Sequence, residues 1–185
     1  MGKGKLIVMS GCSGVGKSTV LSTVMRRRND LRFSVSATTR APRPGEIEGE
    51  SYYFVTKETF LDMIEKGEFL EYDAHMDNYY GTPKGQLDEK LKTGSVILDI
   101  EPNGAFNVRK AWPEAVLIFI APPSMEELER RLRSRGDTSE AQIEKRLARA
   151  KWEMEQSAQY DYTVVNEQVD ACADEILKII AQVAD

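Results

Sequence analysis

Four short apolar runs recur along the chain, separated by longer segments of mixed polarity. The runs are Leu6-Ile7-Val8-Met9, Val96-Ile97-Leu98, Val116-Leu117-Ile118-Phe119-Ile120 and Tyr162-Thr163-Val164-Val165. A short continuous apolar run between turn signals is typical of a strand that is buried on both faces of a parallel sheet. Because helical segments separate the runs, the pattern predicts an α/β fold with helices on both faces of the sheet.

Helix signals fill the spaces between these runs. We expect a helix from about Lys17 to Arg28, directly after the first strand. Ser124 to Glu127 and Ser139 to Gln142 each fit a capping box, which satisfies free N–H groups at the start of a helix. The last helix is predicted from an amphipathic stripe: Val169, Ala173, Ile176 and Ile180.

The stretch from Val35 to about Gln86 has a different pattern. Aromatic and polar residues alternate around Tyr52-Tyr53-Phe54 and Phe69-Leu70-Glu71-Tyr72, and prolines and glycines mark turns between them. Alternation of this kind predicts strands with one buried face. We therefore expect an inserted, mainly antiparallel lobe here.

Composition and charge limit the size of the core, the kinds of partner and the cellular location that we expect. The 185 residues are 41% hydrophobic, enough for one sizeable core, and the net charge of −5 argues against a surface built to bind nucleic acid. Cys12 and Cys172 have no disulfide or zinc-ligand spacing. The longest strongly apolar stretch, Ala115 to Ala121, is far below the roughly 20 residues that span a bilayer. We expect a cytoplasmic protein with no membrane partner.

The strongest local signal is a glycine-rich loop between the first predicted strand and the first predicted helix. Gly11-Cys12-Ser13-Gly14-Val15-Gly16-Lys17-Ser18 matches the phosphate-binding pattern G-x-x-x-x-G-K-[ST]. Such a loop points backbone N–H groups at phosphate oxygens, and the helix after it presents its positive end. We expect this loop and Thr19 to bind ATP, with Lys17 on the β and γ phosphates and Ser18 on Mg²⁺. The alternative is a glycine-rich turn that only caps a helix.

A second magnesium ligand is expected on a neighbouring strand. Asp99 follows Val96-Ile97-Leu98, so a carboxylate stands at the end of a buried strand. A carboxylate in this position suits a hard cation and its water shell. An acidic residue at a strand end can also be an ordinary helix cap or loop residue.

The middle of the chain contains an ordered set of segments that begins at Ser34-Val35-Ser36-Ala37-Thr38-Thr39-Arg40-Ala41-Pro42-Arg43-Pro44-Gly45-Glu46. The further segments are Gly49-Glu50-Ser51-Tyr52-Tyr53-Phe54, Glu68-Phe69-Leu70-Glu71-Tyr72, Asn78-Tyr79-Tyr80-Gly81-Thr82, Ile120-Ala121-Pro122-Pro123-Ser124, Arg131-Leu132-Arg133-Ser134-Arg135-Gly136 and Lys145-Arg146-Leu147. In these segments the chain resembles the guanylate kinase family, and the resemblance covers the chain from about Leu6 to Ile180.

This resemblance implies a fold, a reaction and a division of the chain. The expected fold is a P-loop core with a five-stranded parallel sheet (residues 1–34, 87–124 and 152–185), a GMP-binding lobe (35–86) and a short helical lid (125–151). The expected reaction is the magnesium-dependent transfer of the γ-phosphoryl group of ATP to GMP, which gives ADP and GDP in purine nucleotide metabolism. The substrates ATP and GMP are the expected partners, and the sequence leaves open whether the protein is a monomer or a homo-oligomer.

Arg40 and Arg43 are the candidate ligands of the GMP phosphate. Pro42 stiffens the loop between them, so two guanidinium groups could converge on one phosphate with charge-assisted hydrogen bonds. The alternative for two arginines in a loop is a solvated surface. The resemblance implies that Tyr52 and Tyr80 share this phosphate. It also adds the following residues to the two nucleotide sites: Glu46, Gly81, Asp99 and Glu101 for GMP, and Asn166 for ATP.

Glu71 is the candidate for choosing the base. A carboxylate accepts two hydrogen bonds, and guanine offers N1–H and its 2-amino group side by side. Adenine would present a lone pair at N1 and leave a buried charge unsatisfied, which is costly. The resemblance implies that the hydroxyl groups of Ser36 and Thr82 complete the pocket. Each of them could equally be an ordinary strand or turn hydroxyl.

The transfer needs positive charge rather than a general base, because the phosphate monoester of the acceptor is largely dianionic near neutral pH, its second pKa being about 6. We expect catalysis from the following residues: Lys17, Arg40, Arg43, Arg131, Arg135 and Arg146. The last three would lie on a lid that excludes water. The alternative is a pair of surface helices with ion pairs such as Glu127 with Arg131.

Three positions depart from the family pattern, and two other classes compete. Cys12 stands where proline is common, Glu101 where aspartate is usual and Asn103 where glutamine is usual. Cys12 could become a reactive thiolate near Lys17, although an inert thiol is the simpler interpretation.

The competing classes are a related ribose bisphosphate kinase and a guanylate-kinase-like scaffold module that binds phosphopeptides. The intact loop at Gly16-Lys17-Ser18 argues against the scaffold.

Overall fold

A five-stranded parallel sheet runs through the computed structural model, which describes residues 4–75, 77–134 and 139–184. The strand order is β2-β7-β1-β8-β9. Its strands are β1 (Leu6–Gly11), β2 (Arg32–Phe33), β7 (Val96–Asp99), β8 (Val116–Ala121) and β9 (Tyr162–Val165). Strands β1, β7 and β8 are almost wholly buried, as continuous apolar runs require. The predicted fold class is confirmed.

The chain separates into two compact units, the first made of residues up to Ile7 with Asp30–Ala115 and the second of Val8–Asn29 with Val116–Asp185. Strand β1 passes from one unit to the other. The predicted limits of core, lobe and lid stay predictions.

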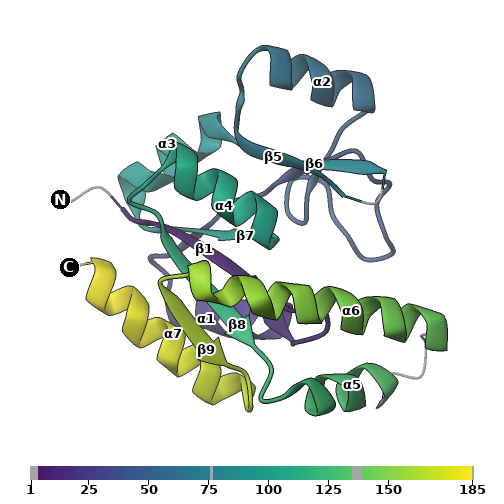
Figure 1. The fold of residues 1–185 in the computed structure, drawn as a ribbon. Helices are drawn as coiled ribbons and strands as arrows, with labels where there is room; N and C mark the ends of the chain where they lie inside the picture. Colours follow the sequence, from purple (N-terminus) through teal and green to yellow (C-terminus); the bar gives the residue numbers. More distant parts are fainter. Residues whose placement is uncertain (1–3, 76, 135–138, 185) are drawn as a thin grey trace. The chain divides into compact units, whose positions relative to one another are not determined.

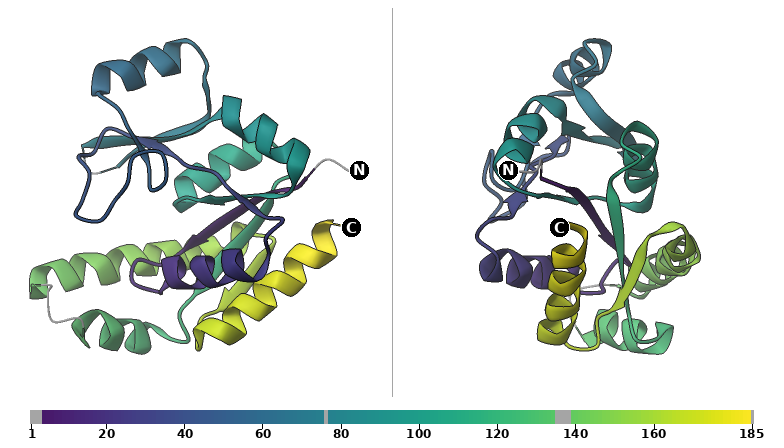
Figure 2. Two further views of the ribbon diagram at one scale, coloured as in Figure 1. Left: turned by 180° about the vertical axis from the view of Figure 1, so that it is seen from behind. Right: turned by 90° about the vertical axis from the view of Figure 1, so that its left-hand side faces the viewer.

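The second unit surrounds β8 and β9 with helices (Figure 1). These are α1 (Lys17–Arg27), α5 (Met125–Ser134), α6 (Glu140–Gln156) and α7 (Val169–Ala184), with a short 3₁₀ turn at Ser157–Gln159. Figure 2 shows α1 and α7 side by side, and Arg27 joins them through ion pairs to Asp170 and Asp174. Ala173, Ile176 and Ile180 are buried, so the predicted apolar stripe of the last helix faces the core.

The predicted capping residues act as follows. The Glu127 N–H donates to the Ser124 hydroxyl at 3.1 Å, but the Glu127 carboxylate accepts from Arg130 and Arg131 instead of completing a capping box. At the start of α6, the Gln142 side chain accepts from the Ser139 N–H at 3.3 Å.

The first unit contains a separate four-stranded sheet in the order β4-β3-β6-β5. Its strands are β3 (Ala37–Thr38), β4 (Tyr53–Phe54), β5 (Phe69–His75) and β6 (Asn78–Pro83). Two of its three ladders are antiparallel and only β3 with β4 is parallel, which confirms the mainly antiparallel prediction. The helices of this unit are α2 (Lys57–Glu65), α3 (Lys84–Thr93) and α4 (Pro102–Ala111).

Helix α2 is not expected from the alternating pattern. The Thr56 hydroxyl caps it by accepting from the Thr59 N–H, and its Phe60 is fully buried against Phe69, with ring centroids 4.4 Å apart. Helix α2 therefore covers one face of the four-stranded sheet (Figure 1). Within the described ranges, no helix combines the length and apolar character needed to cross a bilayer.

Candidate active site

The glycine-rich loop joins β1 to α1 in the second unit. Gly14 and Gly16 have positive φ angles of 87° and 92°, a region that residues with a side chain rarely adopt. Gly16 is the N-cap of α1, and its carbonyl accepts from the N–H groups of Thr19 and Val20. Lys17 and Ser18 therefore stand on the first helical turn, where the helix end favours anions. The geometry is that of a phosphate-binding loop rather than of a simple capping turn.

The loop has no spare space around its glycines. A β-carbon at Gly11 would lie 2.7 Å from the carbonyl oxygen of Ile120 on β8, and one at Gly14 would lie 2.5 Å from Leu132 on α5. The glycines thus serve close packing as well as turning. Strand β8 and helix α5 fix the loop from two sides.

Helix α6 holds the loop through a residue that the sequence reasoning missed. Glu153 is 2% exposed, and its Oε2 accepts from the Ser13 N–H at 3.0 Å, while its Oε1 accepts from Arg149 Nε at 3.1 Å. The available signal was its place on the buried stripe of α6, after Ile143 and Ala150. An acidic residue at such a position implies buried partners.

Cys12 also faces α6. The thiol is 2% exposed and lies 3.6 Å from the carbonyl oxygen of Ala150, to which it donates. Burial, followed by the nearby charge of Glu153, raises the pKa of this thiol to about 12. Burial beneath the loop therefore favours the inert thiol over the thiolate.

Asn166, just after β9, touches the loop from the other side. Its Nδ2 donates to the Val15 carbonyl oxygen at 2.7 Å, and its Oδ1 has no hydrogen-bond partner among the described residues. Arg131 on α5 reaches the same segment, because its guanidinium donates to the Asn166 carbonyl oxygen at 2.9 Å. The structure thus brings the predicted ATP residue Asn166 and the predicted catalytic Arg131 next to the loop.

The structure describes two of the three arginines that were predicted to lie on a lid. Arg131 also donates to Glu127 at 2.8 Å, which is the ion pair expected if α5 and α6 were only surface helices. Arg131 therefore makes this ion pair and the contact with Asn166 at the same time. Arg146 is half-buried on α6. Arg135 lies outside the described residues.

In the first unit, Glu71 is a buried carboxylate on β5. It is 6% exposed, and it accepts a hydrogen bond of 2.6 Å from the Thr82 hydroxyl, its cross-strand partner on β6. Burial, with a smaller effect of the Asp73 charge, raises the pKa of Glu71 to about 7, and the bond from Thr82 acts in the opposite direction. Burial thus disfavours the ionised form of Glu71, and hydrogen-bond donors that approach the carboxylate would favour it.

A β-bulge aims Glu71. Phe69 pairs with Pro83 while Glu71 pairs with Thr82, so Leu70 is an extra residue on β5. Phe69 and Glu71 would share a face on a regular strand, but the bulge sends Phe69 to the Phe60 core and Glu71 to the side of Thr82. Sequence alternation alone cannot show this change of face.

The residues predicted to form the guanine site with Glu71 lie on both faces of the four-stranded sheet. Ala37 pairs with Gly81, so Ser36 just before β3 stands next in register to Thr82. Gly81 faces the other way, where a β-carbon would lie 2.8 Å from the Phe69 ring. Thr82 and Ser36 thus stand with Glu71, whereas the missing side chain of Gly81 serves the packing of aromatic rings.

Arg40 and Arg43, the candidate ligands of the GMP phosphate, both donate hydrogen bonds to the Glu46 carboxylate. Both nitrogens of the Arg40 guanidinium fork donate to the Glu46 carboxylate at 2.8 and 2.9 Å, and the Arg43 backbone N–H donates to it at 2.7 Å. These hydrogen bonds, that of Arg40 first, lower the pKa of Glu46 to about 2. Glu46 therefore orients Arg40, while the Arg43 side chain is exposed.

Two tyrosines stand beside Arg40. Its guanidinium carbon lies 5.3 Å from the centre of the Tyr52 ring, and the rings of Tyr52 and Tyr80 are 6.2 Å apart. The structure thus gathers three of the residues predicted for the GMP phosphate, Arg40, Tyr52 and Tyr80, together with Glu46, which was predicted for the GMP site. Because Arg40 is bound by the Glu46 carboxylate and lies over the rings of Tyr52 and Phe54, it is not a freely solvated arginine.

Asp99 ends β7 and Glu101 is the N-cap residue of α4. Glu101 is exposed, and its backbone carbonyl accepts from the Ala105 N–H at 3.0 Å. Among residues 4–75, 77–134 and 139–184, no three His, Cys, Asp or Glu side chains gather as a metal site. Mg²⁺ that is bound mainly by nucleotide phosphates needs only one or two protein oxygens. Ser18 in the second unit is exposed, and Asp99 in the first unit is half-buried at the end of β7.

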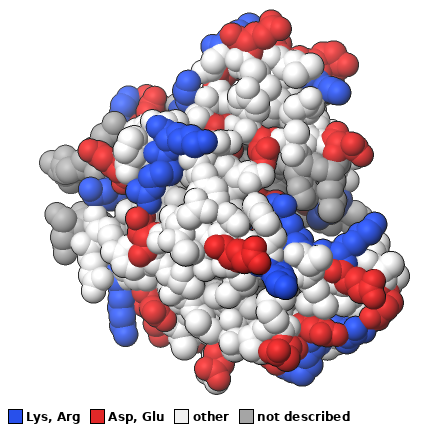
Figure 3. Space-filling model, in the orientation of Figure 1, with Lys and Arg blue, Asp and Glu red and all other residues white. Residues whose placement is uncertain are grey.

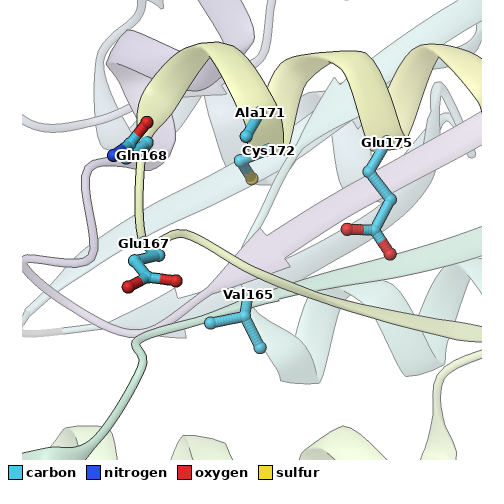
Figure 4. Close-up of a pocket in the computed structure, with 6 residues that line it drawn as sticks. All are labelled: Val165, Glu167, Gln168, Ala171, Cys172 and Glu175. Carbon is cyan, nitrogen blue, oxygen red and sulfur yellow. The ribbon is translucent and has the colours of Figure 1, made fainter.

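A hollow of about 490 Å³ lies beside the start of α7 (Figure 4). Its lining includes the carboxylates of Glu167 and Glu175, and none of the described residues that line it is a cation. Negative side chains repel phosphate, so this hollow does not suit the nucleotide phosphates. Figure 3 shows basic and acidic side chains intermixed over the face in view.

Three features define the class of protein: a buried parallel strand, a loop with positive-φ glycines and a helix that begins at Lys17. They are the features of a P-loop protein that binds nucleotide phosphates.

Comparison with known proteins narrows this class to one family. The family model of guanylate kinase matches residues 3–183. The guanylate kinase of Synechococcus sp. (strain JA-3-3Ab) is 48% identical over 175 residues, which are 94% of this chain and 81% of the relative. That of Clostridioides difficile (strain 630) is 48% identical over 180 residues, 97% of this chain and 88% of the relative.

The solved structures agree. The crystal structure of guanylate kinase from Anaplasma phagocytophilum matches with a TM-score of 0.81 at 37% identity, over 98% of this chain and 87% of that one. The chain belongs to the guanylate kinase family, which confirms the family predicted from the sequence and its assignment as a kinase.

Proposed function

We propose that this chain transfers the γ-phosphoryl group of ATP to GMP, with Mg²⁺, and that each compact unit recognises one nucleotide. The observation that carries the proposal is Glu71, a buried carboxylate bonded to Thr82 on the same sheet as the Arg40 loop. Its two oxygens match the paired donors N1–H and 2-amino of guanine. AMP offers no such pair, which supports GMP as the acceptor.

The second unit would hold ATP. Backbone N–H groups of the loop from Gly11 to Ser18 would surround the phosphates, with Thr19 behind them, and Lys17 would neutralise the β and γ phosphates. The buried Oδ1 of Asn166, an acceptor without a partner among the described residues, supports a ligand or ordered water beside Val15. Arg131 would add positive charge at the same place.

The first unit would hold GMP. Arg40, oriented by Glu46, and the exposed Arg43 would bind its phosphate with Tyr52 and Tyr80. Glu71, Thr82 and Ser36 would read the base. Asp99 and Glu101, at the end of β7 and the start of α4, would act toward the GMP and the metal.

Transfer itself requires the two phosphate groups to meet in line. The dianionic acceptor attacks without a general base, so the residues supply position and charge. Lys17, Arg40, Arg43 and Arg131 would neutralise the migrating group together with Arg135 and Arg146 of the lid. Ser18 and Asp99 would hold Mg²⁺, which would supply further positive charge at the phosphates. We propose a cytoplasmic enzyme of purine nucleotide metabolism.

The test is a coupled assay of ADP release with ATP, Mg²⁺ and one acceptor at a time. The acceptors are GMP, AMP, dTMP, UMP and ribose bisphosphate. We expect substantial turnover with GMP alone, because only guanine satisfies both oxygens of Glu71. Turnover with ribose bisphosphate at the same level would favour the related sugar kinases, and ATP binding without any transfer would favour a scaffold module.

The pKa of Glu71 predicts how GMP binding responds to pH. Guanine donors need the ionised carboxylate, so a proton must leave Glu71 when GMP binds below its pKa of about 7. Lowering the pH from 8 to 6 should therefore raise the KM for GMP about tenfold. The measurement is the KM for GMP at saturating ATP across this range.

Glu71→Gln is the control for this pH effect. The GMP phosphate also gains a proton near its second pKa of about 6, which multiplies the KM about twofold in any variant, so the total rise in the wild type is about twentyfold. The glutamine variant should show only this smaller change. An identical pH dependence of the KM for GMP in both proteins would exclude Glu71 as its source.

A further inference from the structure

Gly104 occupies a position in α4 where the backbone does not call for glycine. It is the third residue of the helix, after Pro102 and Asn103, and it is buried. Its φ lies outside the left-handed region. Alanine is normally preferred to glycine inside a helix. The reason for glycine must therefore be the space around it.

That space is taken by Glu71. A β-carbon on residue 104 would lie 2.9 Å from Glu71 Oε2 and 3.5 Å from Glu71 Cδ, and the next atom is Ile100 Cδ1 at 3.4 Å. The other carboxylate oxygen, Oε1, accepts the 2.6 Å bond from Thr82. The carboxylate is thus confined between the Thr82 hydroxyl and the bare α-carbon of Gly104.

We propose that Gly104 is a specificity-determining position that acts by positioning Glu71 for the guanine base. The inference rests on the proposed role of Glu71. A side chain on α4 would push Oε2 by several tenths of an ångström, away from the position set by Thr82 and the bulge at Leu70. Since hydrogen-bond strength depends steeply on distance and angle, both contacts to guanine would weaken together.

The test is Gly104→Ala. We expect the KM for GMP to rise about tenfold or more and the preference for GMP over AMP to fall by a similar factor, with the KM for ATP unchanged. The matched control is Gly85→Ala, because Gly85 also lies in the first turn of a helix, α3, and a β-carbon there meets nothing within 4 Å. The control should keep both KM values.

A double-mutant cycle with Glu71→Ala separates positioning from general damage. Without the carboxylate there is no clash and no base reading, so Gly104→Ala should add nothing to the KM for GMP in that background. It should also raise the melting temperature there, because alanine favours the helix. These two measurements still apply if Gly104→Ala alone folds poorly.

Two results would overturn the proposal. One is an unchanged KM for GMP in folded Gly104→Ala, and the other is an equal further rise of that KM in the Glu71→Ala background. If Glu71→Ala by itself leaves the KM for GMP and the acceptor preference intact, the proposed base recognition fails, and the inference fails with it. If Glu71→Ala raises the KM for GMP and weakens the acceptor preference as expected, but the effects of Glu71→Ala and Gly104→Ala on the KM add up in the double variant, only the positioning role of Gly104 is refuted.

Discussion

Replacing Lys17 with alanine should lower kcat by about 10³-fold or more. Lys17 is the first residue of α1, directly after the left-handed Gly16, so its ammonium group is set at the end of the loop. Phosphoryl transfer depends on positive charge at the β and γ phosphates, and no neighbouring backbone N–H can replace a full charge. The measurement is steady-state ADP release at saturating ATP and GMP.

Lys110→Ala is the matched control for Lys17. Lys110 is an exposed lysine in the last turn of α4, and its loss should leave kcat unchanged. Near-normal turnover of Lys17→Ala would mean that the loop does not act on the transferred phosphate as proposed.

Glu71→Ala should lower the selectivity for GMP over AMP by about 100-fold or more, because the guanine donors would lose both acceptors in a buried site. The KM for ATP should stay the same, since Glu71 belongs to the first unit and the loop to the second. The measurement is kcat/KM for GMP and for AMP, together with the KM for ATP.

Glu68→Ala is the companion control. Glu68 is an exposed acid just before β5, so its removal changes the charge of the same segment without touching the buried carboxylate. We expect it to keep the wild-type selectivity. If Glu71→Ala also kept it, another residue would have to read the base.

The backbone conformation of the P-loop could be predicted because its information is local. Gly11 to Ser18 are consecutive, and the positive φ angles at Gly14 and Gly16 are conformations that glycine adopts without strain. The continuous apolar runs likewise predicted the strands of the parallel sheet, because both faces of such strands are buried.

The predictions failed or stayed incomplete where distant segments meet. Helix α2 was missed because the aromatic residues around it suggested strands, whereas Phe60 packs across onto Phe69. The chemistry of Cys12 was left open, and burial against Ala150 decided it. Glu153 was missed because its partner Ser13 is far away in the chain.

The sequence by itself determined the fold class and the phosphate loop, since these depend on residue types at short spacing, and its resemblance to guanylate kinases supplied the candidate carboxylate for guanine. Only the tertiary structure decided that Glu71 faces Thr82 and Gly104, because a bulge at Leu70 reverses the face and α4 closes the space. Orientation and desolvation arise from packing between segments that are far apart in the chain, and these set the pKa of Glu71.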